Sequence, residues 1–315
     1  MAAPMRIAVL DDYQNVALQM ADWSAVTDRA DVTVFNDHIA DPDELVARLE
    51  PFDVVFVMRE RTPLPRSIIE RLPNLKMIAS TGPFNASIDM AAAEDHGIHV
   101  GTTGGTVAST VELTWALILA GVRNLVAESQ SVRVGGWQTS VGRELAGRTL
   151  GVLGLGRIGV RVARIGEAFG MKVIAWSQNL TPEAAAEAGA THVSREDLFA
   201  TADVLSVHLK LSGRSTGLVG AAELALMKPT ALLVNTSRGP IVDEAALVAA
   251  LRDRTIAGAA LDVFDTEPLP SGHPLRTLDN VLATPHIGYV ADRPYRIFFR
   301  DAVAAISDWL DANAQ

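Results

Sequence analysis

Three glycines between a predicted strand and a predicted helix restrict the fold of this chain more than any other feature. Gly154, Gly156 and Gly159 form the pattern G-x-G-x-x-G within the segment LGVLGLGRIGVRVARIGEAFG. The apolar run Thr149 to Leu153 before them has the composition of a strand, and a helical stretch follows them. The pattern alone is weak, because glycine-rich turns are common. Between a strand and a helix it predicts a βα unit that binds a dinucleotide.

Each glycine has its own reason to be there. Gly154 allows the tight turn, Gly156 removes the side chain that would block a pyrophosphate, and Gly159 lets the helix pack closely on the strand. The N-terminus of the helix offers free N–H groups and the positive end of its dipole to the diphosphate. We therefore expect the loop that contains Arg157 and Ile158 to bind the diphosphate of a dinucleotide.

Short β-branched runs alternate with helical stretches along the chain, which is typical of parallel βαβ units. The sequence therefore predicts the α/β class, with two doubly wound parallel sheets. The strands expected in the first series are Arg6–Leu10, Val32–Phe35, Val54–Met58, Lys76–Ser80 and Ile98–Val100. Those expected in the second series are Thr149–Leu153, Lys172–Trp176, Val204–His208, Ala231–Asn235, Ala257–Val263 and Val281–Thr284.

The two series meet near Ile98 to Thr103, which predicts two domains. We expect one domain to contain residues 1–98 and 289–315, and the other to contain residues 99–288. The segment Val107 to Leu125 is apolar on most faces, which suits a helix wedged between domains.

Two further helices are indicated by local patterns. The segment DPDELVARL offers Asp41 as the N-cap, Pro42 at the first helical position and Glu44 at the third. The segment Tyr295 to Leu310 is amphipathic and too short to be a domain, so we expect it to pack on the N-terminal unit.

Composition excludes several classes of partner. The formal net charge of −10 leaves no basic field for a phosphate backbone, so nucleic acid is not an expected partner. The chain has no cysteine, which excludes disulfides and thiolate metal sites and fits a reducing compartment. No leader-type stretch opens the sequence, and the longest apolar run, Trp115 to Val122, is too short to span a bilayer. We therefore expect a cytoplasmic protein with no membrane contact and no metal.

Three segments of the second series carry residues suited to catalysis. They are NTSRGPIVDEAAL at 235–247, GAALDVFDTEPLP at 258–270 and TPHIGY at 284–289. Each follows a predicted buried strand, and in a doubly wound sheet the ligands lie beyond the carboxyl ends of the strands. Arg238, Glu267 and His286 can therefore converge. Singly, each has an ordinary explanation: an arginine at a strand end, a surface glutamate, and one of seven histidines in a turn.

In this order and spacing, the glycine loop and the three segments resemble the D-isomer-specific 2-hydroxyacid dehydrogenase family, which includes phosphoglycerate, glycerate and D-lactate dehydrogenases. The resemblance covers nearly the whole chain. It implies a Rossmann cofactor domain joined to a flavodoxin-like substrate domain, with Arg238, Glu267 and His286 as catalytic residues. It also implies hydride transfer between a nicotinamide cofactor and a small 2-keto acid or D-2-hydroxy acid, and a homodimer built on the cofactor domain.

The chemistry of that reaction suits these three side chains. Reducing a 2-keto acid needs a hydride, a proton for the carbonyl oxygen and a cation for the carboxylate. His286 can donate the proton, because histidine exchanges protons near neutral pH. Glu267 can orient the ring and stabilise the imidazolium, and the planar fork of Arg238 can bind the carboxylate and carbonyl oxygens.

The resemblance also implies further contacts to the cofactor. It places Asp262 at the nicotinamide carboxamide and sets Thr236 and Ser237 along the cofactor. His208 matches a strand-end position that borders the cofactor. An equally good explanation of His208 is a strand-end histidine bonded to the backbone.

On the substrate side, Arg59 matches an arginine of phosphoglycerate-type members, although a solvated loop arginine explains it as well. Relatives usually bind the substrate carboxylate through the N–H groups of a G-x-G loop, but here Pro83 follows Gly82 and has no N–H. We therefore expect the backbone of Phe84 and Asn85, together with the Asn85 side chain, to replace that contact. Tyr289, in place of a small residue, is expected to face the substrate. These departures argue against a phosphoglycerate substrate.

The choice between NAD(H) and NADP(H) depends on the end of the second strand of the Rossmann unit. An acidic residue there takes the ribose hydroxyls and repels a 2′-phosphate. Here Ser177 follows Trp176, and neutral Gln178 and Asn179 come next. We expect weak discrimination between the two cofactors, with Arg157 the nearest cation.

Two alternatives remain. Relatives of this fold include dinucleotide-sensing regulatory binding proteins, which can retain the complete catalytic set, and fold alone does not exclude that function. A formate- or phosphite-type dehydrogenase is the other alternative. Formate-type relatives carry glutamine at the position of Glu267, which counts against formate.

Overall fold

The computed structural model describes residues 4–313, and the chain divides into two compact units. The first unit runs through Thr106 and resumes at Ala291, and the second is Val107–Val290. Residues 99–106 lie in the first unit, whereas the expected boundary assigns them to the second domain. The reason is that β5 (His99–Thr102) pairs with β4 (Met77–Ser80) in the first sheet.

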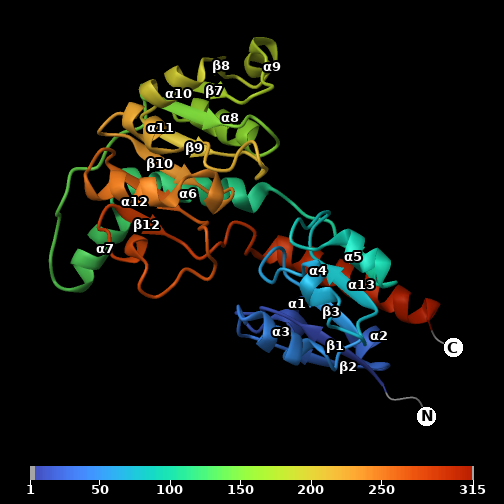
Figure 1. The fold of residues 1–315 in the computed structure, drawn as a ribbon. Coiled ribbons are helices and arrows are strands. Elements are labelled where there is room, and N and C mark those ends of the chain that lie inside the picture. The colour runs from blue at the N-terminus through green and yellow to red at the C-terminus, as the bar shows by residue number, and fades with distance from the viewer. Residues whose placement is uncertain (1–3, 314–315) are drawn as a thin grey trace. The chain divides into compact units, whose positions relative to one another are not determined.

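The first unit is built on a parallel five-stranded sheet with the order β2-β1-β3-β4-β5 (Figure 1). All the strands expected from the first series of β-branched runs are present, so the α/β prediction is confirmed here. The other strands are β1 (Met5–Val9), β2 (Ala30–Val34) and β3 (Val54–Val57). The helices are α1 (Ala17–Met20), α2 (Ser24–Thr27), α3 (Pro42–Leu49), α4 (Arg66–Ile69), α5 (Met90–Asp95) and α13 (Asp292–Ala312).

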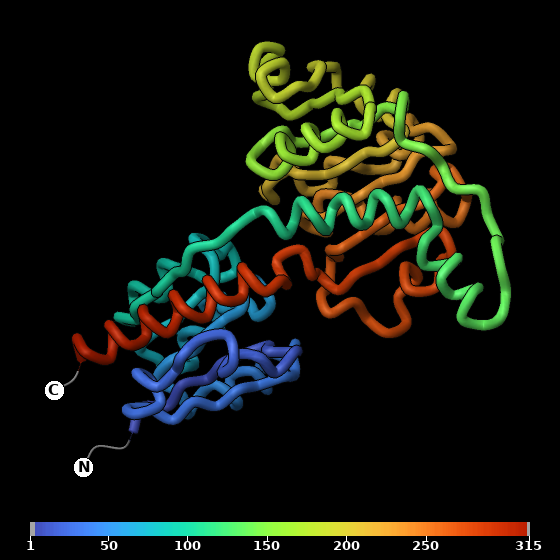
Figure 2. The backbone as a smooth tube through the Cα atoms, turned by 180° about the vertical axis from the view of Figure 1, so that it is seen from behind, coloured from blue at the N-terminus to red at the C-terminus, as the bar shows by residue number. Residues whose placement is uncertain are grey.

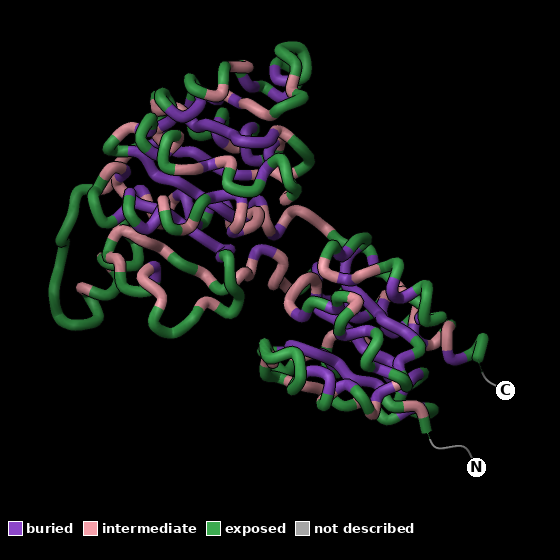
Figure 3. Tube along the Cα trace, in the orientation of Figure 1, coloured by how far each residue is buried: buried purple, intermediate pink, exposed green. Residues whose placement is uncertain are grey.

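The core of the first unit lies on both faces of β3 and β4, in which every residue is buried (Figure 3). Val55 of β3 joins one core cluster with Ile69 of α4. Its neighbour Phe56 points to the other face, as alternate strand residues do. Phe56 stacks there on Phe299 of α13, with the ring centroids 5.2 Å apart. The predicted packing of the C-terminal helix on the N-terminal unit is therefore confirmed.

The predicted start of α3 is also confirmed. The Asp41 side chain accepts hydrogen bonds from the N–H groups of Asp43 at 2.9 Å and Glu44 at 3.0 Å. Pro42 occupies the first helical position, where its missing N–H costs nothing.

The second unit contains a parallel seven-stranded sheet with the order β12-β11-β10-β9-β6-β7-β8, the doubly wound arrangement of a Rossmann fold. The strands are β6 (Thr149–Leu153), β7 (Lys172–Trp176), β8 (Thr191–His192), β9 (Val204–Val207), β10 (Leu232–Asn235), β11 (Gly258–Leu261) and β12 (Val281–Ala283). The helices are α6 (Ala108–Val122), α7 (Leu125–Arg133), α8 (Gly159–Ala168), α9 (Pro182–Glu187), α10 (Arg195–Thr201), α11 (Ala221–Leu226) and α12 (Glu244–Arg252), with short 3-10 helices η1 (Gly239–Ile241) and η2 (Pro274–Arg276).

Helices cover both faces of this sheet (Figure 1). Val204 of β9 belongs to the core cluster that contains Val162 of α8. Leu205, the next residue, belongs to the cluster that contains Leu247 of α12. No strand is predicted at β8, because a pairing of only two residues gives no period in the sequence.

The apolar segment expected to form one helix over 107–125 is broken. α6 ends at Val122, and Asn124 has a φ of 51°, a left-handed value that asparagine tolerates better than most residues. The axis of α7 is bent by 65° from that of α6. α7 and the loop after it extend away from the sheet as an arm (Figure 2).

Within residues 4–313, no single helix combines the length and the apolar composition of a membrane span. The bent pair α6 and α7 has the necessary length and apolar composition only when its two helices are counted together. α6 is a largely buried helix.

Candidate active site

The glycine loop follows β6, at the point where the strand order of the seven-stranded sheet reverses. Open α/β sheets bind their ligands outside the carboxyl ends of the strands at this point. Gly154 has a φ of 101°, and a Cβ added to it would lie 2.9 Å from the backbone of His208. A Cβ added to Gly159 would lie 2.1 Å from the carbonyl oxygen of Gly154. The fold therefore requires glycine at both positions.

Gly156 is different, because the fold does not require it. A Cβ added there would meet nothing within 4 Å, and both Gly156 and Arg157 are exposed. Ile158 is half-buried and packs on the core cluster below the loop. The loop therefore presents bare backbone at Gly156, next to the N-terminus of α8. Such a surface suits the close approach of an anion.

Ser177 follows β7 directly and is half-buried, and its carbonyl oxygen accepts the N–H of Leu180 at 3.1 Å. No carboxylate occupies this strand end, as the sequence indicates.

His208 follows β9 beside the glycine loop. Its N–H donates to the carbonyl oxygen of Leu153 at 2.8 Å, and its Nε2 lies 2.8 Å from Ser206 Oγ. Burial lowers the pKa of His208 to about 4, so the ring is neutral at neutral pH. A neutral ring next to the glycine loop adds no charge to a dinucleotide site.

The segment after β10 is held by Asn235. The Asn235 side chain accepts the N–H of Ser237 at 3.0 Å, and its amide donates to the carbonyl oxygen of Arg238 at 2.9 Å. Thr236 Oγ1 lies 2.8 Å from Thr114 Oγ1, and Ser237 Oγ donates to the carbonyl oxygen of Leu209. These contacts fix the backbone from which the Arg238 side chain extends.

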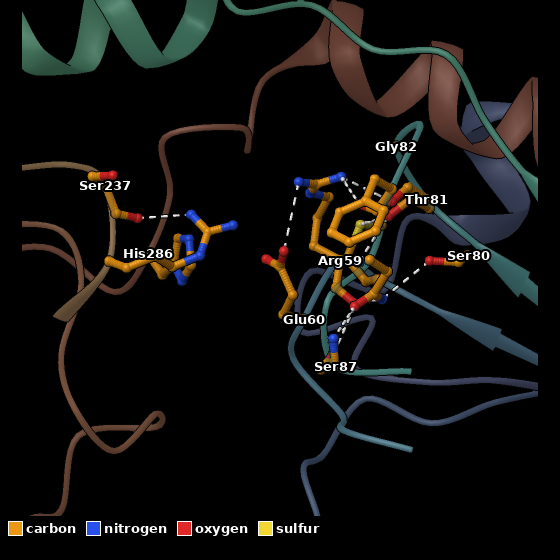
Figure 4. A network of polar contacts seen from close by, with 12 residues as sticks. Arg59, Glu60, Ser80, Thr81, Gly82, Ser87, Ser237 and His286 are labelled. Carbon is orange, nitrogen blue, oxygen red and sulfur yellow. Dashed lines mark hydrogen bonds and ion pairs between the residues drawn. The ribbon is translucent and has the colours of Figure 1, made fainter. Parts of the chain in front are cut away.

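Within that segment, Arg238 Nη1 donates to the carbonyl oxygen of Ser237 at 2.7 Å, the contact drawn from Ser237 in Figure 4. The guanidinium is thus bonded next to its own backbone, on the side of the sheet that carries the glycine loop.

Asp262 follows β11 and is buried. Its Oδ1 accepts from Thr284 Oγ1 at 2.6 Å and from the N–H of Ile287 at 2.8 Å, while Oδ2 accepts the N–H of Gly288 at 2.8 Å. Burial raises the pKa of Asp262, and the hydrogen bond from Thr284 opposes that rise. Asp262 therefore holds in place the segment that carries His286, a structural role that is not predicted from the sequence.

Glu267 and His286 form an ion pair between the loops that follow β11 and β12. His286 Nδ1 lies 2.5 Å from Glu267 Oε2, and Glu267 Oε1 accepts the N–H of Phe264 at 2.9 Å. His286 has a φ of 51°, a strained value for a residue with a side chain. Since Nδ1 faces the carboxylate, Nε2 is the ring nitrogen that can face a ligand. The His286 and Glu267 side chains are 21% and 32% exposed, so a ligand can reach them.

The ring of Tyr289 packs against the ring of His286, the candidate catalytic histidine. The rings of His286 and Tyr289 are 5.4 Å apart at 68°, an edge-to-face contact. Tyr289 therefore limits the positions that the imidazole can adopt.

The residues expected to bind substrate from the N-terminal domain lie on two loops of the first unit. Arg59 follows β3 and Gly82 follows β4 (Figure 4). Phe84 and Asn85 come next in the loop after β4. Arg59 Nη1 donates to the carbonyl oxygen of Thr81 at 3.0 Å, and Phe84 is 54% exposed. The two loops are therefore in direct contact.

The structure corrects the expectation for the Asn85 side chain. Its amide donates to the carbonyl oxygen of Arg59 at 2.6 Å and to Ser80 Oγ at 3.1 Å. Its Oδ1 accepts from both the N–H and the hydroxyl of Ser87, at 3.0 Å and 2.7 Å. With both amide hydrogens and both lone pairs used, the Asn85 side chain holds the loops together and has no hydrogen bond left for a substrate.

Comparison with known proteins bears directly on this arrangement. Residues 115–288 match the model of a family described as D-isomer specific 2-hydroxyacid dehydrogenase, NAD binding domain. The chain belongs to the D-isomer specific 2-hydroxyacid dehydrogenase family. The resemblance stated from the sequence motifs is therefore confirmed.

Individual relatives extend the match to most of the chain. The glyoxylate reductase of Aeropyrum pernix is 42% identical over 267 residues, which cover 81% of this chain and 79% of that protein. The D-3-phosphoglycerate dehydrogenase of Methanocaldococcus jannaschii is 40% identical over 250 residues, which cover 78% of this chain and 47% of that protein. The crystal structure of phosphoglycerate oxidoreductase from Vibrio cholerae o395 matches with a TM-score of 0.93 and 40% identity, covering 98% of this chain and 99% of that one.

Membership in the dehydrogenase family defines the class of reaction. The protein is an oxidoreductase that acts on the CH–OH group of small 2-hydroxy acids with a nicotinamide cofactor. The residues present fit such a cofactor, because Gly156 leaves the loop backbone bare where a side chain would stand in the way of a diphosphate. Gly154, Gly159 and the first turn of α8 frame that surface.

Three residues of this dehydrogenase have structural roles that are not predicted from the sequence: Asn235, which fixes the Arg238 segment, Phe264, whose N–H fixes Glu267, and Thr284, which binds Asp262. For Asn235 a signal exists, since asparagine often bonds the backbone two residues later in a turn. Phe264 bonds a residue three positions later in the loop after β11, whereas the contact of Thr284 joins the ends of β11 and β12 and leaves no local pattern.

Proposed function

We propose that the protein reduces a short 2-keto acid to the D-2-hydroxy acid, with His286 as the proton donor. The observation that carries this proposal is the 2.5 Å contact between His286 Nδ1 and Glu267 Oε2. That contact leaves Nε2 to face the substrate carbonyl, and the carboxylate fixes the orientation of the ring for proton transfer.

The bound nicotinamide supplies the hydride, and the side chains of the chain supply the rest. Glu267 balances the charge of the imidazole. It also holds the ring in one orientation, because Oε1 of Glu267 is itself fixed by the N–H of Phe264. Arg238 binds the carboxylate and the carbonyl oxygen of the substrate through its planar fork. In the reverse direction, His286 accepts the proton of the hydroxyl group.

The cofactor is proposed to bind along the strand ends of the second unit. The diphosphate lies at the glycine loop, which contains Gly154, Gly156, Arg157, Ile158 and Gly159. Ser177 lies at the ribose. Thr236, Ser237 and the neutral His208 border the nicotinamide half. Asp262 uses three acceptor positions on its own loop, which leaves about one of the roughly four positions of a carboxylate for the carboxamide. Asp262 therefore both clamps the His286 segment and contacts the cofactor.

Glyoxylate and hydroxypyruvate are the proposed kind of substrate, with Arg59, Gly82, Phe84 and Tyr289 as the surrounding residues. The Aeropyrum pernix relative is a glyoxylate reductase, and Pro83 argues against a loop like that of phosphoglycerate-type members. The absence of cysteine from the sequence supports a cytoplasmic location for this chemistry.

We further propose that two copies of the chain associate through the arm, defined here as α7 and residues 134–142. Val134, Trp137 and Val141 in the arm are 83%, 73% and 95% exposed. Several large apolar side chains exposed on one segment mark an interaction surface, and a second copy is the partner that the family resemblance implies. Sedimentation should show a dimer at micromolar concentration, and Trp137→Ser with Val141→Ser should shift it toward monomer. A monomeric wild type would overturn the proposal.

The proposed activity is tested by NADH and NADPH oxidation with a panel of 2-keto acids. Turnover with at least one short 2-keto acid is the expected result, and where the product is chiral, as from hydroxypyruvate, it should have the D configuration. Tight cofactor binding without oxidation by any keto acid would favour the dinucleotide-sensing alternative.

A further inference from the structure

One glutamate of α12 anchors the loop after β11, which carries Glu267. Glu244 is the first residue of α12, so the helix holds its backbone in place. Glu244 Oε2 accepts the N–H of Asp265 at 3.3 Å, and Glu244 Oε1 lies 3.0 Å from His273 Nε2. The two oxygens of Glu244 therefore hold the loop at two points, one on each side of Glu267.

The ring of His273 is oriented to make the second of these contacts. Its Nδ1 accepts the N–H of Leu275 at 3.3 Å, so the neutral ring carries its proton on Nε2. Nε2 can then donate to Glu244 Oε1. The side chains of His273 and Glu244 are only 18% and 20% exposed, so water competes less with this contact than with a pair on the surface.

The part of the loop that follows Glu267 is tied to itself. Arg276 Nε donates to the carbonyl oxygen of Pro270 at 2.8 Å, and Arg276 Nη2 donates to the carbonyl oxygen of Leu269. The N–H of His273 also donates to the carbonyl oxygen of Pro270, at 3.0 Å. Since these bonds tie the chain directly after Glu267 to His273, an anchor at His273 also limits the movement of Glu267.

The part of the loop that precedes Glu267 packs against the segment of Arg238. A Cβ added to Gly239 would lie 2.1 Å from the carbonyl carbon of Phe264 and 2.6 Å from the backbone nitrogen of Asp265. The N–H of Phe264 in turn donates to Glu267 Oε1 at 2.9 Å. The anchor at Asp265 therefore lies next to the backbone that fixes the Glu267 carboxylate.

The contact between Glu267 and His286 depends on the position of this loop. It joins two loops that follow different strands, β11 and β12, and its length is 2.5 Å. A hydrogen bond weakens when its donor and acceptor move apart, and a misplacement of about 1 Å can cost a reaction about 100-fold in rate. Whatever holds the loop after β11 therefore affects the pair.

We propose that Glu244 is a positioning residue of the reaction. It holds the loop after β11 so that Glu267 stays against His286, and it acts on proton transfer through Glu267, with His273 as its partner. This inference rests on the proposed function, in which Glu267 orients the proton donor.

Variants of the two anchoring residues test this role. Glu244→Ala removes both contacts, so kcat for glyoxylate reduction should fall about 10- to 100-fold, while KM for glyoxylate and the Kd for NADH stay within about twofold. Glu244→Gln keeps one oxygen as an acceptor and should lose less. His273→Ala removes one contact only, and its loss in kcat should also be smaller than that of Glu244→Ala.

Glu223 offers a matched control in the same unit. It lies in the first turn of α11, accepts the N–H of Gly220 at 3.0 Å and forms an ion pair with Arg195 of α10. Glu223→Ala therefore removes the same two kinds of contact, but these contacts join α11 to α10. In this variant kcat should stay within about twofold of the wild type.

A double variant separates positioning from a general loss of stability. In the Glu267→Ala background, Glu244→Ala should lower kcat by less than about twofold more, because the carboxylate that it positions is already gone. A loss that acts through the fold as a whole would instead multiply in both backgrounds. Thermal unfolding is measured on each variant, and if Glu244→Ala does not fold, His273→Ala provides the same comparison.

Three results would overturn this inference: an unchanged kcat in Glu244→Ala, an equal loss from Glu223→Ala, or the same factor of loss with and without the Glu267 carboxylate. In all three cases, keto acid reduction by the wild type would still support the proposed function. A wild type that reduces no keto acid would overturn the proposed function, and this inference with it.

Discussion

His286 Nδ1 lies 2.5 Å from Glu267 Oε2, at the carboxyl edge of the seven-stranded sheet. The two residues come from different strand ends, and each is also held by its own neighbours. Phe264 fixes the second oxygen of Glu267, while Asp262 bonds the N–H groups that follow His286. The pair is thus arranged before any substrate arrives, which is the condition for efficient proton transfer.

Glu267→Gln removes the negative charge and keeps the size of the side chain. We expect kcat/KM for keto acid reduction to fall by about 100-fold or more. Steady-state rates across pH test this, with cofactor affinity as the control. Rates equal to those of the wild type at every pH would show that Glu267 has no part in the proton transfer.

Two glycines of the same loop should respond in opposite ways. Gly156→Ala adds a Cβ to open space, so the free energy of unfolding should stay within about 0.5 kcal/mol while the Kd for NADH rises at least about tenfold. Gly159→Ala places a Cβ 2.1 Å from the carbonyl oxygen of Gly154, and should lower the free energy of unfolding by about 2 kcal/mol or more. Chemical denaturation and cofactor fluorescence measure the two effects. If Gly156→Ala bound NADH as tightly as the wild type, the diphosphate would not bind at this loop.

Much of the fold could be predicted because its signals are local. β-branched runs and the glycine pattern each lie within one short segment, and they identify the strands of both sheets except β8. The break at Asn124 has only a weak local signal, since the apolar residues on both sides favour a continuous helix. Strand and helix identities thus come from periodicity, while kinks and short edge strands do not.

The candidate site divides in the same way. Residue type and order are enough to predict that His286 and Glu267 meet. The use of the Asn85 amide depends on Arg59, which follows a different strand and meets Asn85 only in the folded unit. The clamp by Asp262 likewise depends on β11 and β12 lying side by side. Such contacts between strand ends have no period or motif that a sequence displays.

The stability of the protein should depend on the protonation of His208. Burial lowers the pKa of His208 to about 4, so the folded state binds fewer protons there than the unfolded state. Its contribution is complete above the unfolded pKa of about 6.5 and is lost as the pH falls toward 4. The free energy of unfolding of the wild type should fall between pH 7 and pH 5. In His208→Gln, this fall should be smaller by up to about 2 kcal/mol. Urea denaturation at both pH values measures this, with the exposed His99→Gln as control. Equal losses in His208→Gln and wild type would contradict the burial effect.

The two nicotinamide cofactors should be used almost equally well. Ser177 neither repels a 2′-phosphate nor attracts it strongly, so catalytic efficiencies with NADH and NADPH should agree within about tenfold, or about 1.4 kcal/mol. Ser177→Asp should favour NADH by at least about tenfold more, because a carboxylate repels the phosphate. Both efficiencies are measured on the same keto acid. A wild-type preference above about a hundredfold would be inconsistent with this account, and one for NADPH would point to Arg157 as a ligand of the phosphate.

The central claim is that His286 delivers the proton in a nicotinamide-dependent reduction of a 2-keto acid. The most direct test is the glyoxylate-dependent oxidation of NADH by the wild type and by His286→Ala, with NADH affinity and thermal unfolding measured on both. The account predicts turnover by the wild type and a loss of about 100- to 10,000-fold in kcat for His286→Ala, with cofactor affinity and stability unchanged. Near-wild-type turnover by His286→Ala would contradict it.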